Sequence, residues 1–152
     1  MLDPVLRTNP RSKLYDTKQA RTIVVTLEAE GSRRSQPFTK RGVEVWTATG
    51  ANGRIKLEPV LRRLVKDGAL HVLVEGGATA HQSFLEENLV DELVLFIAPK
   101  LFGDSGITWS GALGIQDPAK ALQFEAIDAV AVGTDLMVTA RRSSGKFKNA
   151  AD

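Results

Sequence analysis

The sequence predicts an α/β fold with a largely parallel sheet, helices on both faces and an antiparallel edge. Three observations support this prediction: short apolar runs alternate with segments of helical period, the first run is β-branched throughout, and two alternating runs close the chain. Such patterns are typical of parallel strands covered by helices and of a terminal hairpin. The 152 residues suit a single domain with its own core. We expect that domain over residues 1–142 and a flexible tail over 143–152.

The first half of the chain predicts two strands and a helix. Residues 1–20 form an extended, turn-rich lead-in, and residues 22–26 are a β-branched run that suits a strand buried on both faces. The polar stretch 28–41 predicts a loop or a short surface helix, and residues 43–46 predict a second strand. A helix follows over 57–66, with Pro59 in its first turn and Gly68 at its end. Its expected inward stripe is Leu57, Val60, Leu61, Leu64 and Val65.

The second half predicts four further strand segments, one helix and a long loop. We expect a strand over 70–74, a helix over 78–88 with Ala80, Phe84 and Leu85 inward, and a strand over 93–98. Glycine recurs through residues 101–118, which predicts a loop. The closing hairpin is expected over 122–132 and 135–142, joined at Gly133 and Thr134.

Composition excludes several classes of function. Apolar residues make up 43%, charged residues 25%, and the formal net charge is +2, so a concentrated basic surface for nucleic acid is not indicated. No cysteine is present, which excludes disulfides, thiolate catalysis and cysteine-bound zinc. No spacing of histidines or carboxylates suggests a metal site. The longest apolar run, 93–98, is too short to cross a bilayer, and the first ten residues lack the apolar core of a secretory signal. We expect a cytoplasmic protein that binds neither membrane nor nucleic acid.

The strongest local motif lies at residues 71–80, where a predicted strand ends in Glu75, Gly76 and Gly77 and a helix begins at once. Ligands of α/β sheets bind at the carboxyl ends of strands, and glycines let a bulky group approach the backbone. The helix N-terminus offers free N–H groups and the positive end of the dipole, which suits a pyrophosphate. Thr79 and Ser83 are candidate hydroxyl donors. The alternative is a tight turn with no ligand.

Glu75 is the candidate catalytic residue. A carboxylate at the end of a buried strand needs a partner, which a substrate hydroxyl or amine would provide, and it suits proton transfer. The alternative is a cap on neighbouring backbone N–H groups. The basic residues of 33–41 either meet a 2′-phosphate or form a solvated loop. Trp109, in the glycine-rich loop, is either a rim residue or a ligand contact.

Residues 72–103, VLVEGGATAHQSFLEENLVDELVLFIAPKLFG, resemble the reductase half of the bifunctional deaminase–reductase of riboflavin biosynthesis, the RibD C-terminal domain. Residues 2–8, 22–26 and 132–141 fit the same family in order. The resemblance implies a three-layer α/β/α, dihydrofolate-reductase-like mixed sheet. It also implies NADPH-dependent reduction of the ribosyl group of 5-amino-6-(5-phosphoribosylamino)uracil to ribityl. By this resemblance Glu75 contacts the substrate, and the cofactor is held by Gly76, Gly77, Ala78, Thr79, Ala80, His81, Gln82 and Ser83.

The chain departs from the family pattern at its beginning. Residue 1 falls where the family's third strand runs, so we expect the family's first strands and part of the substrate pocket to be absent from this truncated domain. Pro4 stands at the position of a family serine and lacks both a hydroxyl and an N–H. The alternative to a reductase is therefore a non-catalytic remnant that binds a nucleotide or a partner. The family is commonly dimeric, so the resemblance implies a homodimer.

Overall fold

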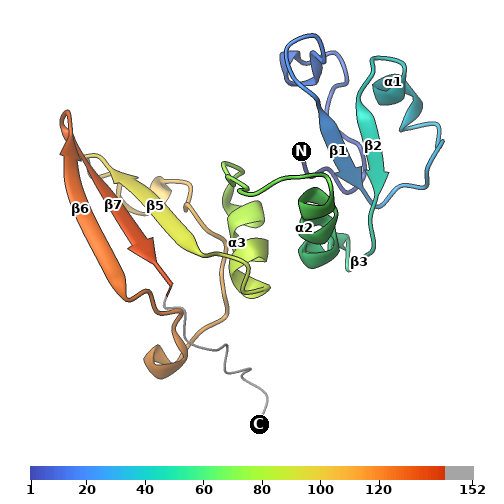
Figure 1. The fold of residues 1–152 in the computed structure, drawn as a ribbon. Helices are drawn as coiled ribbons and strands as arrows, with labels where there is room; N and C mark the ends of the chain where they lie inside the picture. The colour runs from blue at the N-terminus through green and yellow to red at the C-terminus, as the bar shows by residue number, and fades with distance from the viewer. Residues whose placement is uncertain (143–152) are drawn as a thin grey trace. The chain divides into compact units, whose positions relative to one another are not determined.

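The computed structural model describes residues 1–142, and the predicted flexible tail over 143–152 lies outside the described residues. The chain divides into two compact units, Met1–Val74 and a second that begins at Glu75. Figure 1 shows the elements of each unit in chain order. The predicted three-layer arrangement of a single domain stays a prediction. Among residues 1–142, no helix is long and apolar enough to span a membrane.

The first unit is built on two parallel strands, whose register pairs Val24 with Val45. The N-terminal segment lies beside β1, because Leu2 bridges Val25 in parallel and the N–H of Asp3 donates to the Val25 carbonyl. These two parallel strands, β1 and β2, correspond to the strands predicted at 22–26 and 43–46. In chain order the elements are η1 (Lys13–Tyr15), β1 (Ile23–Thr26), α1 (Gln36–Thr39), β2 (Glu44–Thr47), β3 (Gly50–Ala51), β4 (Arg54–Ile55) and α2 (Leu57–Lys66).

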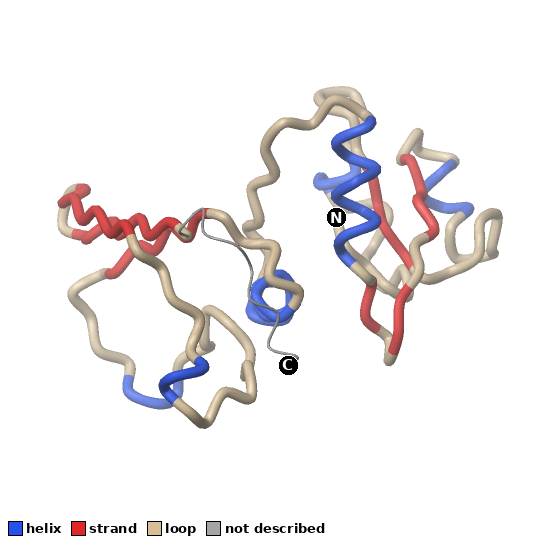
Figure 2. Tube along the Cα trace, turned by 60° about the horizontal axis from the view of Figure 1, so that its bottom comes forward, coloured by secondary structure: helices blue, strands red, loops and turns tan. Residues whose placement is uncertain are grey.

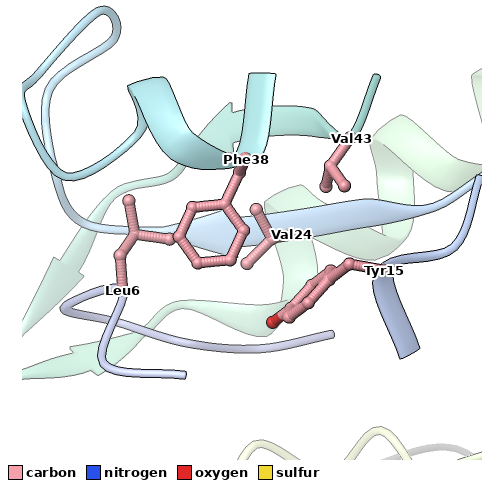
Figure 3. Close-up of a cluster of buried hydrophobic side chains, with 5 residues drawn as sticks. All are labelled: Leu6, Tyr15, Val24, Phe38 and Val43. Carbon is pink, nitrogen blue, oxygen red and sulfur yellow. The ribbon is translucent and has the colours of Figure 1, made fainter. Parts of the chain in front are cut away.

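Strand β1 is buried on both faces, as its β-branched composition predicts. Figure 3 shows the cluster on one face, in which Tyr15 and Phe38 meet edge to face with ring centroids 5.0 Å apart. On the other face Val25 packs with Trp46 and with the inward side of α2. The first cluster comprises Leu6, Tyr15, Val24, Phe38 and Val43, and the second comprises Val25, Trp46, Ile55 and Val60.

Helix α2 has the predicted bounds and the predicted glycine stop. Gly68 adopts φ 91°, and the N–H of Ala69 donates to the carbonyl of Leu64, which satisfies a free carbonyl at the helix end. The expected inward stripe is wrong at Val65, which is 67% exposed. At about 100° per residue, Val65 falls at the edge of the apolar stripe, furthest from Val60, so its side chain faces solvent.

The second unit holds a helix and a three-stranded antiparallel sheet in the order β5-β7-β6. The tight turn at Gly133 and Thr134 joins β6 to β7, which confirms the predicted hairpin, although β6 begins at Ala126 and not at residue 122. Strand β7 also pairs with β5 (Figure 1). Figure 2 shows the long connection between β5 and β6, which contains two short helical turns. The elements are α3 (Ala78–Glu86), β5 (Glu92–Ile97), η2 (Gly103–Ser105), η3 (Pro118–Lys120), β6 (Ala126–Val132) and β7 (Asp135–Arg141).

Pairing in the described residues differs from the expected single, mostly parallel sheet. Three small sheets form, and parallel pairing is confined to β1, β2 and the Leu2 bridge. The strand predicted over 70–74 is wrong, because these residues pair with no strand within 1–142, and Leu70 is 90% exposed. An apolar run favours a strand, but a strand forms only where a neighbour supplies its backbone hydrogen bonds.

A short hairpin between β2 and α2 was not predicted. Strands β3 and β4 pair across Asn52 and Gly53, which adopt φ values of 53° and 73°. Two successive residues with positive φ are what the commonest two-residue hairpin turn requires. The Asn-Gly dipeptide was the signal in the sequence, although the flanking strands of two residues are too short to show alternation.

Candidate functional site

The N-terminus of α3 presents unpaired backbone donors. Gly77 is the N-cap in an extended conformation, and the first bonds of the helix run from the N–H groups of Ala80 and His81 to the Gly77 carbonyl, at 2.9 and 3.2 Å. Within residues 1–142 the N–H groups of Gly77, Ala78 and Thr79 have no acceptor. Free N–H groups together with the positive end of a helix dipole favour an anion such as a phosphate.

The two glycines ahead of the helix have different roles. A Cβ on Gly76 would lie 2.9 Å from the Cβ of Ala80, which is closer than side chains approach, so this position has room only for glycine. A Cβ on Gly77 would meet nothing within 4 Å. The space beside the Gly77 Cα is therefore open, and no side chain of this residue fills it. This opening fits a bulky group such as the pyrophosphate of a nicotinamide dinucleotide.

The hydroxyl groups of α3 are placed unequally. The Ser83 hydroxyl donates to the carbonyl of Thr79 at 3.0 Å, one turn earlier in its own helix. Its hydrogen is therefore already used within the helix and is not free for a ligand. Thr79 is exposed in the first turn, next to the free N–H groups. Of the two predicted hydroxyl donors, Thr79 has the better position to meet a ligand.

His81 and Gln82 face the glycine-rich loop. The Nδ1 atom of His81 lies 2.6 Å from the carbonyl oxygen of Trp109, and the Gln82 amide donates to the carbonyl of Ala112 at 2.8 Å. A carbonyl only accepts, so His81 must carry a proton on Nδ1. These two side chains are thus engaged with the loop. Their predicted role as direct cofactor contacts stays a prediction.

Glu75 is an exposed residue at the first position of the second unit. The expectation that it ends a buried strand is wrong, since residues 70–74 form no strand. A solvated carboxylate carries none of the desolvation cost that a buried one would, so Glu75 needs no protein partner. It follows Val74 and precedes the glycines, and its carboxylate is available to a substrate hydroxyl or amine.

The basic residues proposed for a 2′-phosphate lie in the first unit. Arg34 is already paired, because its Nη1 donates to the carbonyl of Val5 at 3.0 Å and to Glu28 at 3.2 Å. Arg33, Lys40 and Arg41 are exposed. The structure therefore favours the solvated-loop interpretation for Arg34, which fastens the lead-in segment to the loop after β1.

A second polar cluster, which the sequence did not predict, lies among Asp3, Thr8 and Tyr15. Asp3 is 2% exposed, and its carboxylate accepts from the backbone N–H groups of Arg7 and Thr8 at 3.1 and 2.9 Å. The Thr8 hydroxyl is 2.6 Å from both Asp3 and the Tyr15 hydroxyl. A carboxylate only accepts, so Tyr15 donates to Thr8 and Thr8 donates to Asp3.

This cluster shifts the titration of its acid and its phenol in opposite directions. Burial on its own would raise the pKa of Asp3, but the hydrogen bonds from Thr8 and Arg7 outweigh it and hold that pKa below its usual value. Burial raises the pKa of Tyr15, and the nearby negative charge of Asp3 raises it further. The carboxylate and the neutral phenol are therefore the stable forms at neutral pH. The available signal in the sequence was the dipeptide Asp3-Pro4, which favours a turn.

Pro4 contributes to the same segment through its backbone. Its carbonyl accepts from the N–H of Leu27 at 2.9 Å and from the hydroxyl of Thr26 at 3.0 Å. The absence of an N–H at this residue leaves no unmet donor beside β1. Proline therefore fits at this position, although it offers a ligand no hydroxyl.

Comparison with known proteins identifies the family. A family model described as the RibD C-terminal domain matches residues 1–138. The chain belongs to this family. The riboflavin biosynthesis protein RibD of Aquifex aeolicus is 32% identical over 142 residues, covering 93% of this chain and 38% of the relative. The chain thus spans less than half the length of that RibD relative.

A shorter relative and two solved structures extend the comparison. The 2,5-diamino-6-ribosylamino-4(3H)-pyrimidinone 5′-phosphate reductase of Methanothermobacter thermautotrophicus is 30% identical over 139 residues, covering 91% of this chain and 62% of the relative. RibD of Acinetobacter baumannii superposes with a TM-score of 0.77 at 24% identity, covering 93% of this chain and 36% of that one. The riboflavin biosynthesis reductase Rib7 of Saccharomyces cerevisiae gives 0.70 at 18%, covering 94% and 68%. The two structures confirm the predicted α/β, dihydrofolate-reductase-like fold.

Proposed function

We propose that this chain is an NADPH-dependent reductase that converts the ribosyl group of 5-amino-6-(5-phosphoribosylamino)uracil to ribityl. The observation that carries the proposal is the N-terminus of α3, which follows Gly76 and Gly77 and which no side chain caps, in a chain that belongs to the RibD C-terminal domain family. The relatives that match along most of the chain are named as riboflavin biosynthesis proteins and as a pyrimidinone phosphate reductase.

The residues of α3 supply what the cofactor's phosphates need. The free N–H groups of Gly77, Ala78 and Thr79 are preorganised donors, and the open space beside Gly77 gives a phosphate room to reach them. NADPH, when bound, supplies the hydride for the reduction and leaves as NADP⁺. The preference for NADPH over NADH is part of the proposal.

Glu75 acts on the substrate in this proposal. It directly precedes the two glycines, so it stands two to four residues before the N–H groups proposed to anchor the cofactor. An exposed carboxylate orients sugar hydroxyls by accepting their hydrogen bonds, and it holds or delivers the proton that the reduced product requires. Glu75 is therefore assigned to substrate positioning and proton transfer, with cofactor binding left to α3.

The test is a turnover assay on the purified chain with Glu75→Gln. NADPH consumption is followed by its absorbance with two substrates in turn. The first is 5-amino-6-(5-phosphoribosylamino)uracil, and the second is 2,5-diamino-6-ribosylamino-4(3H)-pyrimidinone 5′-phosphate, the compound in the name of the Methanothermobacter relative. We expect Glu75→Gln to reduce turnover by about 10²-fold or more, within the range that proton transfer contributes. NADPH affinity should change less than about threefold. Full activity in Glu75→Gln contradicts its role, and tight NADPH binding without turnover of either substrate favours the non-catalytic remnant.

We also infer a homodimer. Several apolar side chains of the β5-β7-β6 sheet are exposed, with Phe96 at 63% and Ile127 at 65%. Apolar surface of this kind is typical of an interaction site, and a second copy is the partner that the resemblance implies. Sedimentation of the full chain tests this: a single species of monomer mass at micromolar concentration contradicts the dimer.

A further inference from the structure

The middle of the long loop between β5 and β6 is fastened to the first turns of α3. Three hydrogen bonds make the connection, and we call them the clasp. They run from His81 to Trp109 at 2.6 Å, from Gln82 to Ala112 at 2.8 Å and from the N–H of Gly111 to the carbonyl of Ala78 at 3.1 Å. Two of the donors are side chains of α3, and one is the loop's own backbone.

The clasp is what holds this loop, because packing contributes little. Across residues 101–121 every residue is exposed except Ser110, Gly111 and Leu113, which lie at the clasp. Apolar side chains elsewhere in the loop find no core, and Leu101 and Ile107 are fully exposed. A segment with few buried contacts is held by its hydrogen bonds alone, so the clasp sets the loop's position.

Gly111 makes the close approach to the helix possible. A Cβ at this residue would lie 2.1 Å from the side-chain oxygen of Gln82, far inside contact distance. Its φ is not in the left-handed region, so the backbone itself would accept alanine. Alanine here would therefore displace the end of the Gln82 side chain, which makes the hydrogen bond to Ala112.

The clasp places Trp109 next to the turn that presents the free N–H groups. His81 and Gln82 lie about one turn after Ala78 and Thr79 along α3, and the Trp109 ring centroid lies 6.4 Å from that of His81. Half of the Trp109 surface is exposed. A half-exposed indole near a helix N-terminus with free N–H groups offers a ligand a flat apolar face, which suits a heteroaromatic ring.

We propose that His81 and Gln82 are positioning residues that hold loop 109–112 as a wall of the nucleotide site, so that Trp109 contacts the bound nicotinamide dinucleotide. The inference rests on the proposed function, because it takes the ligand at α3 to be NADPH. It departs from the expectation that His81 and Gln82 touch the cofactor themselves. Their contribution to affinity is instead to keep the loop in its binding conformation.

The primary test compares Gly111→Ala with Gly106→Ala in the same loop. The second substitution is the matched control, because its Cβ would meet its nearest atom at an ordinary 3.8 Å. We expect Gly111→Ala to weaken NADPH binding by about tenfold, the effect of losing one or two hydrogen bonds. Gly106→Ala should keep the wild-type affinity within about twofold. Amide hydrogen exchange over 109–112 should become faster in Gly111→Ala alone.

A double variant distinguishes the clasp from general damage. Gln82→Ala removes the two atoms that a Cβ at residue 111 would meet at 2.1 and 2.8 Å and leaves only the Cβ at 3.1 Å. Adding Gly111→Ala to it should therefore cost less than about twofold in NADPH affinity. If the losses of NADPH affinity in the two single variants instead add in the double variant, the steric link between residues 111 and 82 is refuted. At residue 81, phenylalanine keeps a ring without a donor and should weaken binding, whereas asparagine restores a donor near Nδ1 and should recover most of the affinity.

Tryptophan fluorescence separates the clasp from the proposed function. The chain has two tryptophans, so Trp46→Phe leaves Trp109 as the sole emitter. We expect NADPH to quench Trp109 over the same concentration range in which it binds. If exchange over 109–112 accelerates in Gly111→Ala while NADPH affinity stays within twofold, the clasp does not serve the site. If wild-type protein binds no NADPH, the proposed function and the wall both fail, and exchange still reports whether the clasp exists.

Discussion

Thr8 is the residue whose replacement tests the buried polar cluster most sharply. Its hydroxyl accepts from Tyr15 and donates to Asp3, both at 2.6 Å, so valine in its place breaks the chain of hydrogen bonds in the middle. Valine has nearly the shape of threonine, so the packing is disturbed little. The substitution therefore isolates the two hydrogen bonds from changes in volume.

The magnitude follows from what each partner loses. The bond to Asp3 involves a charged acceptor and contributes about 1.5–3 kcal/mol, and the Tyr15 hydroxyl, in a side chain only 1% exposed, loses its acceptor at a cost of about 1–3 kcal/mol. Asp3 keeps its two backbone donors, and solvent reaches the half-buried residue 8, so the full sum is not expected. We expect Thr8→Val to lower the free energy of unfolding by about 2–4 kcal/mol.

The assay is urea denaturation followed by the emission of Trp46, which lies in the same unit as Thr8. A Trp109→Phe background removes the second emitter. Thr22→Val is the matched control, because its hydroxyl bonds only to a nearby exposed carbonyl at 3.2 Å, and it should change stability by less than about 0.5 kcal/mol. If Thr8→Val unfolds at the control's midpoint with an unchanged slope, the cluster does not stabilise this unit as argued.

Three further predictions concern the same structure. The stability advantage of wild type over Asp3→Asn should be complete above about pH 4 and should shrink as pH falls through the lowered pKa of Asp3, as measured by urea midpoints across pH; a constant difference contradicts it. Gly50→Ala places a Cβ 2.1 Å from the Arg54 carbonyl oxygen and should cost about 1–3 kcal/mol in thermal unfolding, whereas an unchanged midpoint means the β3–β4 hairpin is looser than described. Gly76→Ala should destabilise the protein by a similar amount. Gly77→Ala should instead change stability by less than about 1 kcal/mol and weaken NADPH binding in a fluorescence titration; equal effects of the two substitutions contradict their separate roles.

Local patterns were sufficient to predict most of the elements. The helical period over 57–66 and the glycine after it predicted α2 to the residue, and the alternation around Gly133 predicted the β6–β7 hairpin. These elements depend on nearby residues, whose spacing is visible in the sequence. Pairing partners are not visible in that way. The run over 70–74 has the composition of a strand, yet composition does not show whether another strand lies beside it.

The candidate site was predicted only where its residues are neighbours in the sequence. Gly76, Gly77 and the start of α3 are consecutive in the chain, so their common geometry followed from the motif. The contacts of His81 and Gln82 with loop 109–112 span about thirty residues, and no local pattern in the sequence predicts them. The cluster around Asp3 depends on a turn between residues 3 and 8 that brings two backbone donors to one carboxylate.

The central claim is that the N-terminus of α3 binds the phosphates of NADPH. The most direct measurement is a titration of the purified full chain with NADPH and with NADH, followed by nicotinamide fluorescence, in wild type and in Gly77→Ala. We expect micromolar NADPH binding in wild type, weaker NADH binding, and a clear loss of NADPH affinity in Gly77→Ala. No binding of either nucleotide up to millimolar concentration, or identical binding by wild type and Gly77→Ala, would contradict the claim.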